Sequence, residues 1–523
     1  MADGMDNETR KATLGERLHN AVTASVSSVL GVFAPVAALR YAAGRDAMLS
    51  YAAATRKGPN GRWRPKDGKP DLLITRDRKL VQARARAMIK NNPNMGGAIE
   101  KIVDNVVFGG IWPQVQLYDA TGTRDKATNS RIEGEFREWA VAVDWVEKQQ
   151  LAVRHLWMDG AYIIHHVLDN DLLREGLVPY RPELLTYDAI DPGVHGRQPN
   201  GNIALWGQEF SPDGKRVGLH IRKQDPLSAV SFSAETVFIP SQWCTLVMPQ
   251  RWIGQTQPMS WMAAVLMTLH DFDEYLSSER IAARLAAAFG IFIKRPQTDL
   301  GGNALNGLPG GAVSGGAGTD GSPILAGKFI ESGRIDSLPP GADIAVAKSD
   351  RPGTTFGPYT SNALRMVSAG LRMSAEAFSN DYTESTYASA RSGSLEERRS
   401  YRSQQFLLGA RHNAPIWRKW CWVRATFGMG DEGRGKPIPM RDQLPGWQWV
   451  DPKNDAQAAE IRIKNILDTR RGLCAESGLD FDDVVDGQQE EGTQIRGAGL
   501  NPEPWAGSGT STGANDAAQD AGQ

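Results

Sequence analysis

The chain has 523 residues, which predicts three or four domains and leaves enough length to bury a sizeable core. With 59 Lys and Arg against 60 Asp and Glu, and with 41% hydrophobic and 23% charged residues, its composition is that of an ordinary globular protein. This balance excludes a uniformly basic coat for nucleic acid. The 55 glycines and 29 prolines indicate that much of the chain runs through turns and loops.

The N-terminal segment contains an uncharged run at residues 21–39 that has the length of a signal peptide or a membrane span. Serines, threonines, Gly31 and Pro35 dilute its apolar content, and four acidic residues precede it. We therefore predict that the protein has no membrane role. We also expect residues 1–55 to be partly disordered.

Apolar residues at helical spacing predict two helices over residues 76–107, with a break at Asn91-Asn92-Pro93. Two more helices are predicted over 129–158, separated near Asp144. A β region follows, with strands predicted at 161–168, 184–187, 203–210, 216–222, 234–239 and 244–248. Ser211-Pro212-Asp213-Gly214 is typical of a tight hairpin turn between two of these strands.

The second half of the chain has a helical pattern. The run from Pro258 to Phe289 has no internal Pro or Gly and predicts one long helix. Residues 296–323 hold nine glycines and three prolines, so they must form a loop. Further helices are predicted at 358–373, at 388–409 continuing past Pro415 to about Phe427, at 453–471 and at 480–489. The Gly-, Ala-, Ser- and Thr-rich residues 497–523 are expected to be disordered.

Charge is segregated along the chain although the total is close to zero. Residues 56–90 carry twelve basic and three acidic residues, and residues 391–424 carry eight basic and two acidic residues. From residue 473 onward there are ten acidic residues and one arginine. This pattern indicates contact with a polyanion, or basic and acidic faces of neighbouring subunits that meet in an assembly. Solvated helix faces remain an alternative for each run.

Motifs for catalysis are missing from the sequence. No Gly-x-x-x-x-Gly-Lys-Ser/Thr, His-Glu-x-x-His or Gly-x-Ser-x-Gly pattern occurs, and the three cysteines are too scattered for a zinc site or a disulfide framework. We therefore predict no metal and no cofactor. The pairs Asp169-x-Asp171, Asp271-x-Asp273 and Asp480-x-Asp482 leave a metal-dependent nuclease open as an alternative.

Blocks of the sequence carry a resemblance to a known family. They are Ala83–Arg86 through Asn91-Asn92-Pro93, Val103–Val107, Gly134–Trp139, Arg280–Gly290, Arg351-Pro352-Gly353, Ser379–Tyr382 with Tyr387–Arg391, and Trp449-Val450-Asp451-Pro452. In this order, over roughly residues 30–490, they resemble the lambda-type family of tailed-bacteriophage portal proteins. The Gly-rich insert at 299–321 and the long neutral tail depart from the family pattern.

The resemblance implies an α+β fold, that of a portal-type subunit with an α+β wing, a two-helix stem, a loop-rich clip, a long wing helix and a small helical crown. It places the wing at 56–257, the first stem helix at 258–289, the clip with its Gly-rich insert at 290–350, the second stem helix at 351–374, the tunnel loop at 375–390, the long wing helix and following segment at 391–450, the crown helices at 451–490 and a disordered tail at 491–523.

The resemblance also implies which residues face the DNA. Asp381, Tyr382, Thr383, Glu384 and Tyr387 would line the bore of the tunnel, with Arg391 just behind them. Because this loop holds no Lys or Arg before Arg391, it offers few strong phosphate contacts, which suits a surface over which DNA slides. Two further sets stay open: Arg398, Arg399 and Arg402 touch DNA or pair with a neighbouring subunit, and Asp271, Asp273 and Glu274 form a repelling ring in the stem or a solvated outer face.

By the same resemblance, the function is structural and not enzymatic. The family implies a ring, usually of twelve copies, at one capsid vertex of the virion, assembled in the bacterial host cytoplasm, through which double-stranded DNA is packaged and ejected. The implied partners are further copies of the chain, DNA, the terminase large subunit, the major capsid and scaffold proteins and a head-completion connector protein. A membrane-associated assembly factor that uses residues 21–39 is a weaker alternative.

Overall fold

The computed structural model describes residues 68–224, 232–288, 292–294, 343–345, 353, 356–432 and 435–498. The chain divides into two compact units, Met1–Leu73 and Ile74–Gln523, and the account below concerns the second. The apolar run at 21–39, the Gly-rich loop at 296–323 and the tail from 499 onward lie outside the described residues. Among the helices that are described, none is both long and apolar enough to cross a membrane.

Four helices open the described chain: α3 (Pro70–Asn91), α4 (Pro93–Val106), α5 (Lys126–Ala142) and α6 (Trp145–Met158). The Asn92 side chain caps α4 by accepting a hydrogen bond of 2.8 Å from the Met95 amide, and Pro93 sits in the first turn, where no N–H is needed. Asp144 separates α5 from α6 with a φ of 53°, a conformation that ends a helix. Both predicted helix pairs are therefore confirmed.

Beside these helices the described residues form three antiparallel sheets. A two-stranded sheet joins β1 (Trp112–Val115) to β12 (Met440–Gln443), and a three-stranded antiparallel sheet has the order β3 (Tyr180–Thr186), β2 (Tyr162–Leu168), β9 (Cys244–Val247). A five-stranded antiparallel sheet follows the chain order through β4 (Gly196–Arg197), β5 (Ile203–Leu205), β6 (Gln208–Phe210), β7 (Arg216–Gln224) and β8 (Phe232–Pro240). Short helical segments α7 (Asn170–Arg174) and η3 (Tyr187–Ala189) connect strands.

The predicted single strand at 203–210 is two strands. Trp206 and Gly207 have φ values of 53° and 77°, so the chain turns back between β5 and β6 instead of remaining extended. The hairpin turn predicted at Ser211–Gly214 is confirmed, because the Gly214 amide donates to the Ser211 carbonyl at 2.9 Å.

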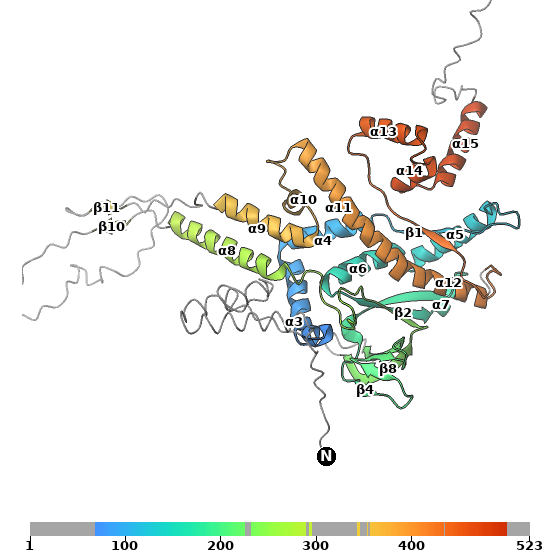
Figure 1. The fold of residues 1–523 in the computed structure, drawn as a ribbon, viewed down its shortest axis with the longest axis horizontal. Helices are drawn as coiled ribbons and strands as arrows, with labels where there is room; N and C mark the ends of the chain where they lie inside the picture. Colours follow the sequence, from blue (N-terminus) through green and yellow to red (C-terminus); the bar gives the residue numbers. More distant parts are fainter. Residues whose placement is uncertain are drawn as a thin grey trace, which may run out of the picture. The chain divides into compact units, whose positions relative to one another are not determined.

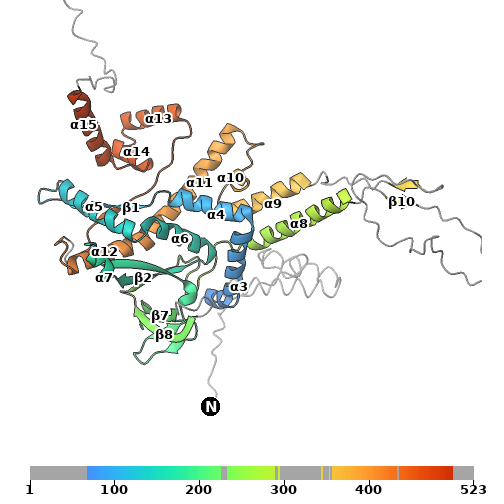
Figure 2. The same ribbon diagram turned by 180° about the vertical axis from the view of Figure 1, so that it is seen from behind.

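Helices α8 (Leu266–Ala288) and α9 (Phe356–Leu371) lie side by side (Figures 1 and 2). The prediction that a helix begins at Pro258 is wrong, since residues 258–260 have no regular structure and residues 261–265 form turns. The Ser260 hydroxyl donates to the Trp157 carbonyl at 2.9 Å and Met262 is fully buried, so tertiary contacts hold this segment against its helical propensity. Strands β10 (Phe292–Lys294) and β11 (Asp343–Ala345) pair beyond these helices.

The next three helical elements form one continuous run, as predicted. It comprises α11 (Tyr387–Leu408), one π-helical turn η4 (Gly409–Asn413) and α12 (Ala414–Thr426), and is preceded by the short α10 (Ala375–Ser379). The run passes Pro415 without a break because this residue lies in the first turn of α12.

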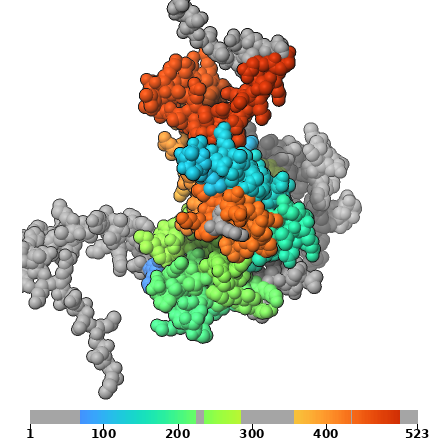
Figure 3. All heavy atoms as spheres, turned by 90° about the vertical axis from the view of Figure 1, so that its right-hand side faces the viewer, coloured from blue at the N-terminus to red at the C-terminus, as the bar shows by residue number. Residues whose placement is uncertain are grey.

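The C-terminal helices are α13 (Pro452–Lys464), α14 (Arg470–Glu476) and α15 (Phe481–Gly497). The predicted single helix at 453–471 is wrong, because α13 ends at Lys464, Ile466 has a φ of 57°, and the Thr469 hydroxyl caps α14. Figure 3 shows these helices in red next to the segment that includes α5, where Lys126 lies 3.1 Å from Asp486.

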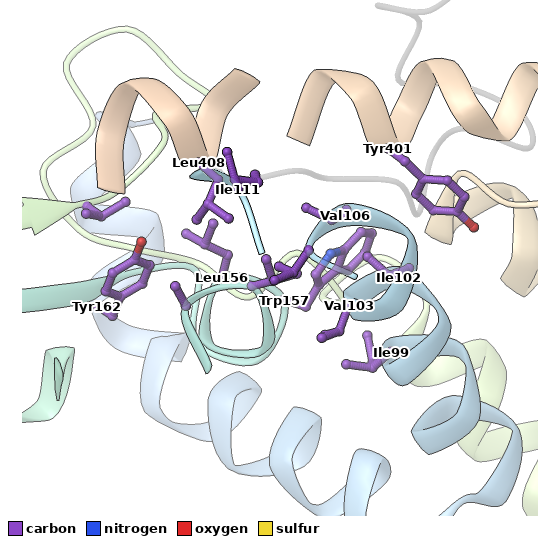
Figure 4. Packing of buried hydrophobic residues seen from close by; sticks show 14 of the residues in the cluster. Ile99, Ile102, Val103, Val106, Ile111, Leu156, Trp157, Tyr162, Tyr401 and Leu408 are labelled. Carbon is purple, nitrogen blue, oxygen red and sulfur yellow. The ribbon is translucent and has the colours of Figure 1, made fainter. Parts of the chain in front are cut away.

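The hydrophobic core joins residues from both halves of the chain. The Phe136 ring lies 5.0 to 5.5 Å from the rings of four buried tryptophans, Trp139, Trp145, Trp417 and Trp420. Such pairs contribute beyond the area that they bury. Elsewhere in the same core, α4 presents Val103 and Val106 to Trp157 of α6 (Figure 4).

Two buried histidines contribute a pH-dependent stability to this core. His412, in the π-helical turn, lies 2.9 Å from the Tyr162 hydroxyl, and His166 lies 2.7 Å from the Tyr180 hydroxyl. Desolvation by burial lowers the pKa of each imidazole to about 3, far below the ordinary value of 6.5. Both rings are therefore neutral in the folded chain, while the unfolded chain takes up protons as the pH falls below 6.5.

We predict that the free energy of unfolding is constant above pH 6.5 and falls by about 1 kcal/mol per pH unit for each of these histidines as the pH drops toward 3. Denaturant titrations between pH 7 and pH 5, where few carboxylates protonate, measure this slope. The double variant His166→Gln/His412→Gln should flatten it, whereas His270→Gln on the exposed face of α8 should not. An unchanged slope in the double variant contradicts the prediction.

Gly160 and Gly176 offer a matched pair for a second prediction. Both have a positive φ, 80° and 81°, but a Cβ on Gly160 would lie 2.1 Å from the Met259 carbonyl oxygen, while a Cβ on Gly176 meets no atom within 4 Å. We expect Gly176→Ala to cost about 1 kcal/mol through backbone strain alone. Gly160→Ala should cost about 3 kcal/mol or more, because the overpacking adds to the same strain. Equal losses in thermal denaturation would exclude the steric explanation.

Candidate channel loop and basic helix

The loop between α10 and α11 is built from capped and self-bonded turns. The Ser374 hydroxyl caps α10, and Asn380 ends it in the left-handed conformation with a φ of 56°. Asp381 then accepts hydrogen bonds from the Thr383 amide at 3.0 Å and from the Thr383 hydroxyl at 2.6 Å. These bonds lower the pKa of Asp381 and keep its carboxylate charged.

The side chains predicted to face DNA are all at the surface of the isolated chain. Asp381, Thr383 and Glu384 are exposed, and Tyr382 and Tyr387 are 53% and 61% exposed. The base of the loop is fixed at two points: the Lys101 ammonium donates to the Ala377 carbonyl and to Asn380, and Glu397 accepts from the Ser374 amide at 2.7 Å. The loop therefore combines a rigid base with an exposed polar tip.

Helix α11 begins at a capping box. The Thr386 hydroxyl accepts from the Ser389 amide at 3.2 Å, and the Ser389 hydroxyl accepts from the Thr386 amide at 3.0 Å. One turn later Arg391 forms an ion pair of 2.6 Å with Asp455 of α13. Hydrogen bonds from the Asp451 amide and from Arg391 lower the pKa of Asp455. Arg391 is thus bound within its own subunit.

The other three arginines of the basic helix differ in their surroundings. Arg398 donates to the Gln448 carbonyl at 3.1 Å, and the guanidinium groups of Arg398 and Arg402 lie over the Trp447 ring at 5.8 and 4.9 Å. Their partial desolvation lowers the pKa of both groups, which nevertheless stay cationic at neutral pH. The side chain of Arg399 is 82% exposed, and its ion pair is with Glu396 on the same helix.

The acidic residues predicted for the first stem helix do not share one environment. Asp273 accepts two hydrogen bonds, of 2.7 and 2.8 Å, from the side-chain amide of Asn92, so it ties α8 to the start of α4. Glu274 lies 3.4 Å from His270 one turn earlier, and Asp271 is exposed. A common role for these three carboxylates is therefore not built into the single chain.

The aspartate pairs considered for metal binding are engaged in other contacts. Asp169 caps α7 and pairs with Arg181 at 2.9 Å, and Asp171 pairs with Arg174 at 2.6 Å. Asp482 bonds Arg124 and Arg471. Within the described ranges, no group of three His, Cys, Asp or Glu side chains could hold a metal ion.

Sequence reasoning missed the residues that support the loop and the helix. Lys101, Asn92, Trp447 and Asp455 lie between 45 and 279 positions from the residues that they contact in the loop and the two helices, so no local spacing marks them. The sequence predicted a helix break at Asn91-Asn92-Pro93, but not the hydrogen bond from Asn92 to Asp273.

Several known proteins are similar to this chain in sequence. The sequence model described as phage portal protein, lambda family, matches residues 56–405. A probable portal protein of Halomonas phage phiHAP-1 is 24% identical over 462 residues, which cover 85% of this chain and 86% of that protein. Portal protein B of Escherichia phage lambda is 23% identical over 185 residues, which cover 33% of this chain and 34% of that protein.

A solved structure titled neck of native GTA particle computed with C12 symmetry contains a similar chain, with 12% identity and a TM-score of 0.40, covering 80% of this chain and 95% of that one. The family match alone spans 350 of the 523 residues, from 56 to 405. The chain therefore belongs to the lambda family of phage portal proteins.

Proposed function

We propose that copies of this chain close into a ring, of about twelve subunits by analogy with its family, at one capsid vertex, and that double-stranded DNA passes through the ring during packaging and ejection. The observation that carries the proposal is the loop before α11, which presents an exposed polar tip without a lysine or arginine on a base fixed by Lys101 and Glu397. In this proposal Asp381, Tyr382, Thr383, Glu384 and Tyr387 line the narrow part of the channel.

The chemistry of this tip supports passage rather than retention of DNA. Each protein cation that neutralises a phosphate adds salt-dependent affinity, and many such contacts would hold the duplex in place. The negative charges of Asp381 and Glu384 oppose close approach of phosphates. Because Arg391 is bound to Asp455, the nearest cation of α11 is also turned toward the protein's own subunit.

The rest of the proposed assembly follows from the family. Helices α8 and α9 would form the stem, residues 290–350 the clip that meets the terminase and the head-completion protein, and α13 to α15 the crown inside the capsid. The role is structural, the location is the portal vertex of the virion, and the DNA motor is a separate protein. Capsid and scaffold proteins would surround the wing.

The proposed function can be tested with the full-length purified protein. Mass photometry and negative-stain images should give a closed ring with a central hole, and magnesium should not induce cleavage of plasmid DNA. A chain that stays monomeric under all assembly conditions would overturn the ring. Magnesium-dependent cleavage would instead favour a nuclease that uses the aspartate pairs, a function that their existing ion pairs argue against.

We predict that Glu384→Arg makes the assembled ring retain DNA. Glu384 is exposed, and the change adds two units of positive charge per subunit at the tip, so duplex binding should become tighter and fall more steeply between 50 and 200 mM salt. In vitro packaging should slow while mass photometry shows the same ring. Asp213→Arg, in the exposed turn between β6 and β7, is the matched control and should change neither quantity. Intact rings with unaltered DNA binding and packaging would refute a channel position for this residue.

A further inference from the structure

Phe406 of α11 is a large apolar side chain that is 63% exposed at the junction of three hollows. A groove of about 610 Å³ runs along α11 on one side of it, and a pocket of about 420 Å³ lies on another. We call the surface around Phe406 the basic aromatic face, and it comprises Arg251, Arg372, Leu395, Arg398, Arg399, Arg402, Phe406 and Trp449. The function proposed above gives this face no role.

The positive charge of this face is poorly compensated. In the described part of the chain, the guanidinium groups of Arg251 and Arg372 form no ion pair, and desolvation together with the nearby Arg372 lowers the pKa of Arg251. Arg372 also holds a φ of 60°, a strained conformation at a helix end that Gly or Asn usually occupies. Glu476 lines the groove, but its carboxylate is bonded to Arg462.

The composition of the face fits a protein partner better than DNA. Leu395 and Trp449 are 48% and 44% exposed, so together with Phe406 they interleave large apolar groups with the arginines. Arg, Trp and Phe are enriched at protein interfaces, where they supply most of the binding energy. Surfaces that bind duplex phosphates are more polar. The partner should therefore present carboxylates beside apolar side chains.

Helix α15 has that composition. None of its 17 residues is buried, although most helices in proteins depend on packing for their stability. Lys126 and Arg124 bind Asp486 and Asp482, but Asp483, Glu490 and Glu491 have no ion pair within the described ranges. At 100° per residue these three carboxylates fall within about 100° of one another around the helix. On the same scale the half-buried Val484 and Ile495 fall within about 40° of Glu491, so apolar side chains lie beside the carboxylates.

We propose that the basic aromatic face of one copy binds α15 of a second copy of this chain. The proposal rests on the ring of the proposed function and assigns one of its subunit contacts. Two different surfaces meet in such a contact, so it is heterologous, the type that closes into rings. Opposite charge sets the register of the two surfaces, and Phe406 with Trp449 provides the apolar area that is removed from water.

A charge-exchange experiment on the full-length protein tests this contact. Arg372→Glu/Arg399→Glu and, separately, Glu490→Arg/Glu491→Arg should each raise the protein concentration for half-maximal ring assembly at least about tenfold, as measured by mass photometry. Combining all four changes should restore most of the assembly, because the opposite charges face each other again. Arg418→Glu, at an exposed position of α12, and Asp213→Arg are matched controls that should assemble like the wild type.

The outcomes separate this contact from the function as a whole. If the wild type forms rings and both double variants assemble at the same protein concentration as the wild type, the contact is overturned and the ring remains. Weaker duplex binding by intact rings of Arg372→Glu/Arg399→Glu would also overturn it, since the face would then serve DNA. Loss of assembly without recovery in the fourfold variant would show that these charges do not face each other. Circular dichroism melting confirms that each variant is folded.

Discussion

The packing of α12 against the aromatic cluster of α5 and α6 is the constraint on which the position of the candidate channel loop depends. Trp417 and Trp420 of α12 lie about 5.3 Å from Phe136, and the neighbouring Arg424, fully buried, pairs with Glu135 at 2.6 Å. Because α11, η4 and α12 form one helical run from Tyr387 to Thr426, fixing α12 in the core also fixes where α11 begins. The exposed loop is therefore positioned by a buried contact about 30 residues away, in addition to the bonds of Lys101 and Glu397 at its base.

The π-helical turn in the middle of this run is a buried polar centre. Asn413 donates to Asp442 of β12 at 3.1 Å and accepts from Gln149 of α6 at 2.9 Å, and burial raises the pKa of Asp442. Gly409 has no side chain where a Cβ would lie 2.4 Å from the Asp442 carboxylate. A satisfied polar network in an apolar core disfavours other packings, since any shift leaves buried groups without partners. The network thus fixes the rotation of the long helix, and with it the face on which Arg399 and Phe406 are displayed.

Local signals in the sequence predicted the fold well where the structure is decided locally. The cap at Asn92, the left-handed Asp144 and the Ser211–Gly214 turn all act over a few residues. Long-range effects were missed: β1 pairs with β12 across more than 300 residues, and tertiary contacts replace the first turns expected from Pro258. At the candidate site, the family resemblance predicted the channel loop and the arginines of α11. Their partners, such as Asp455 for Arg391, lie too far along the chain to be read from spacing.

The C-terminal helices differ from the rest of the subunit because they bury almost no side chains. The core completes the bonds of buried charges such as Arg424, whereas α13 buries Ala459 alone and α14 and α15 bury no side chain. Ile466 and Leu467 are 92% and 75% exposed in the link between α13 and α14. Helices this short gain little stability by themselves in water. The exposed apolar groups here, and the arginines around Phe406 that form no ion pair among the described residues, are the surfaces that a neighbouring subunit would cover in the proposed ring.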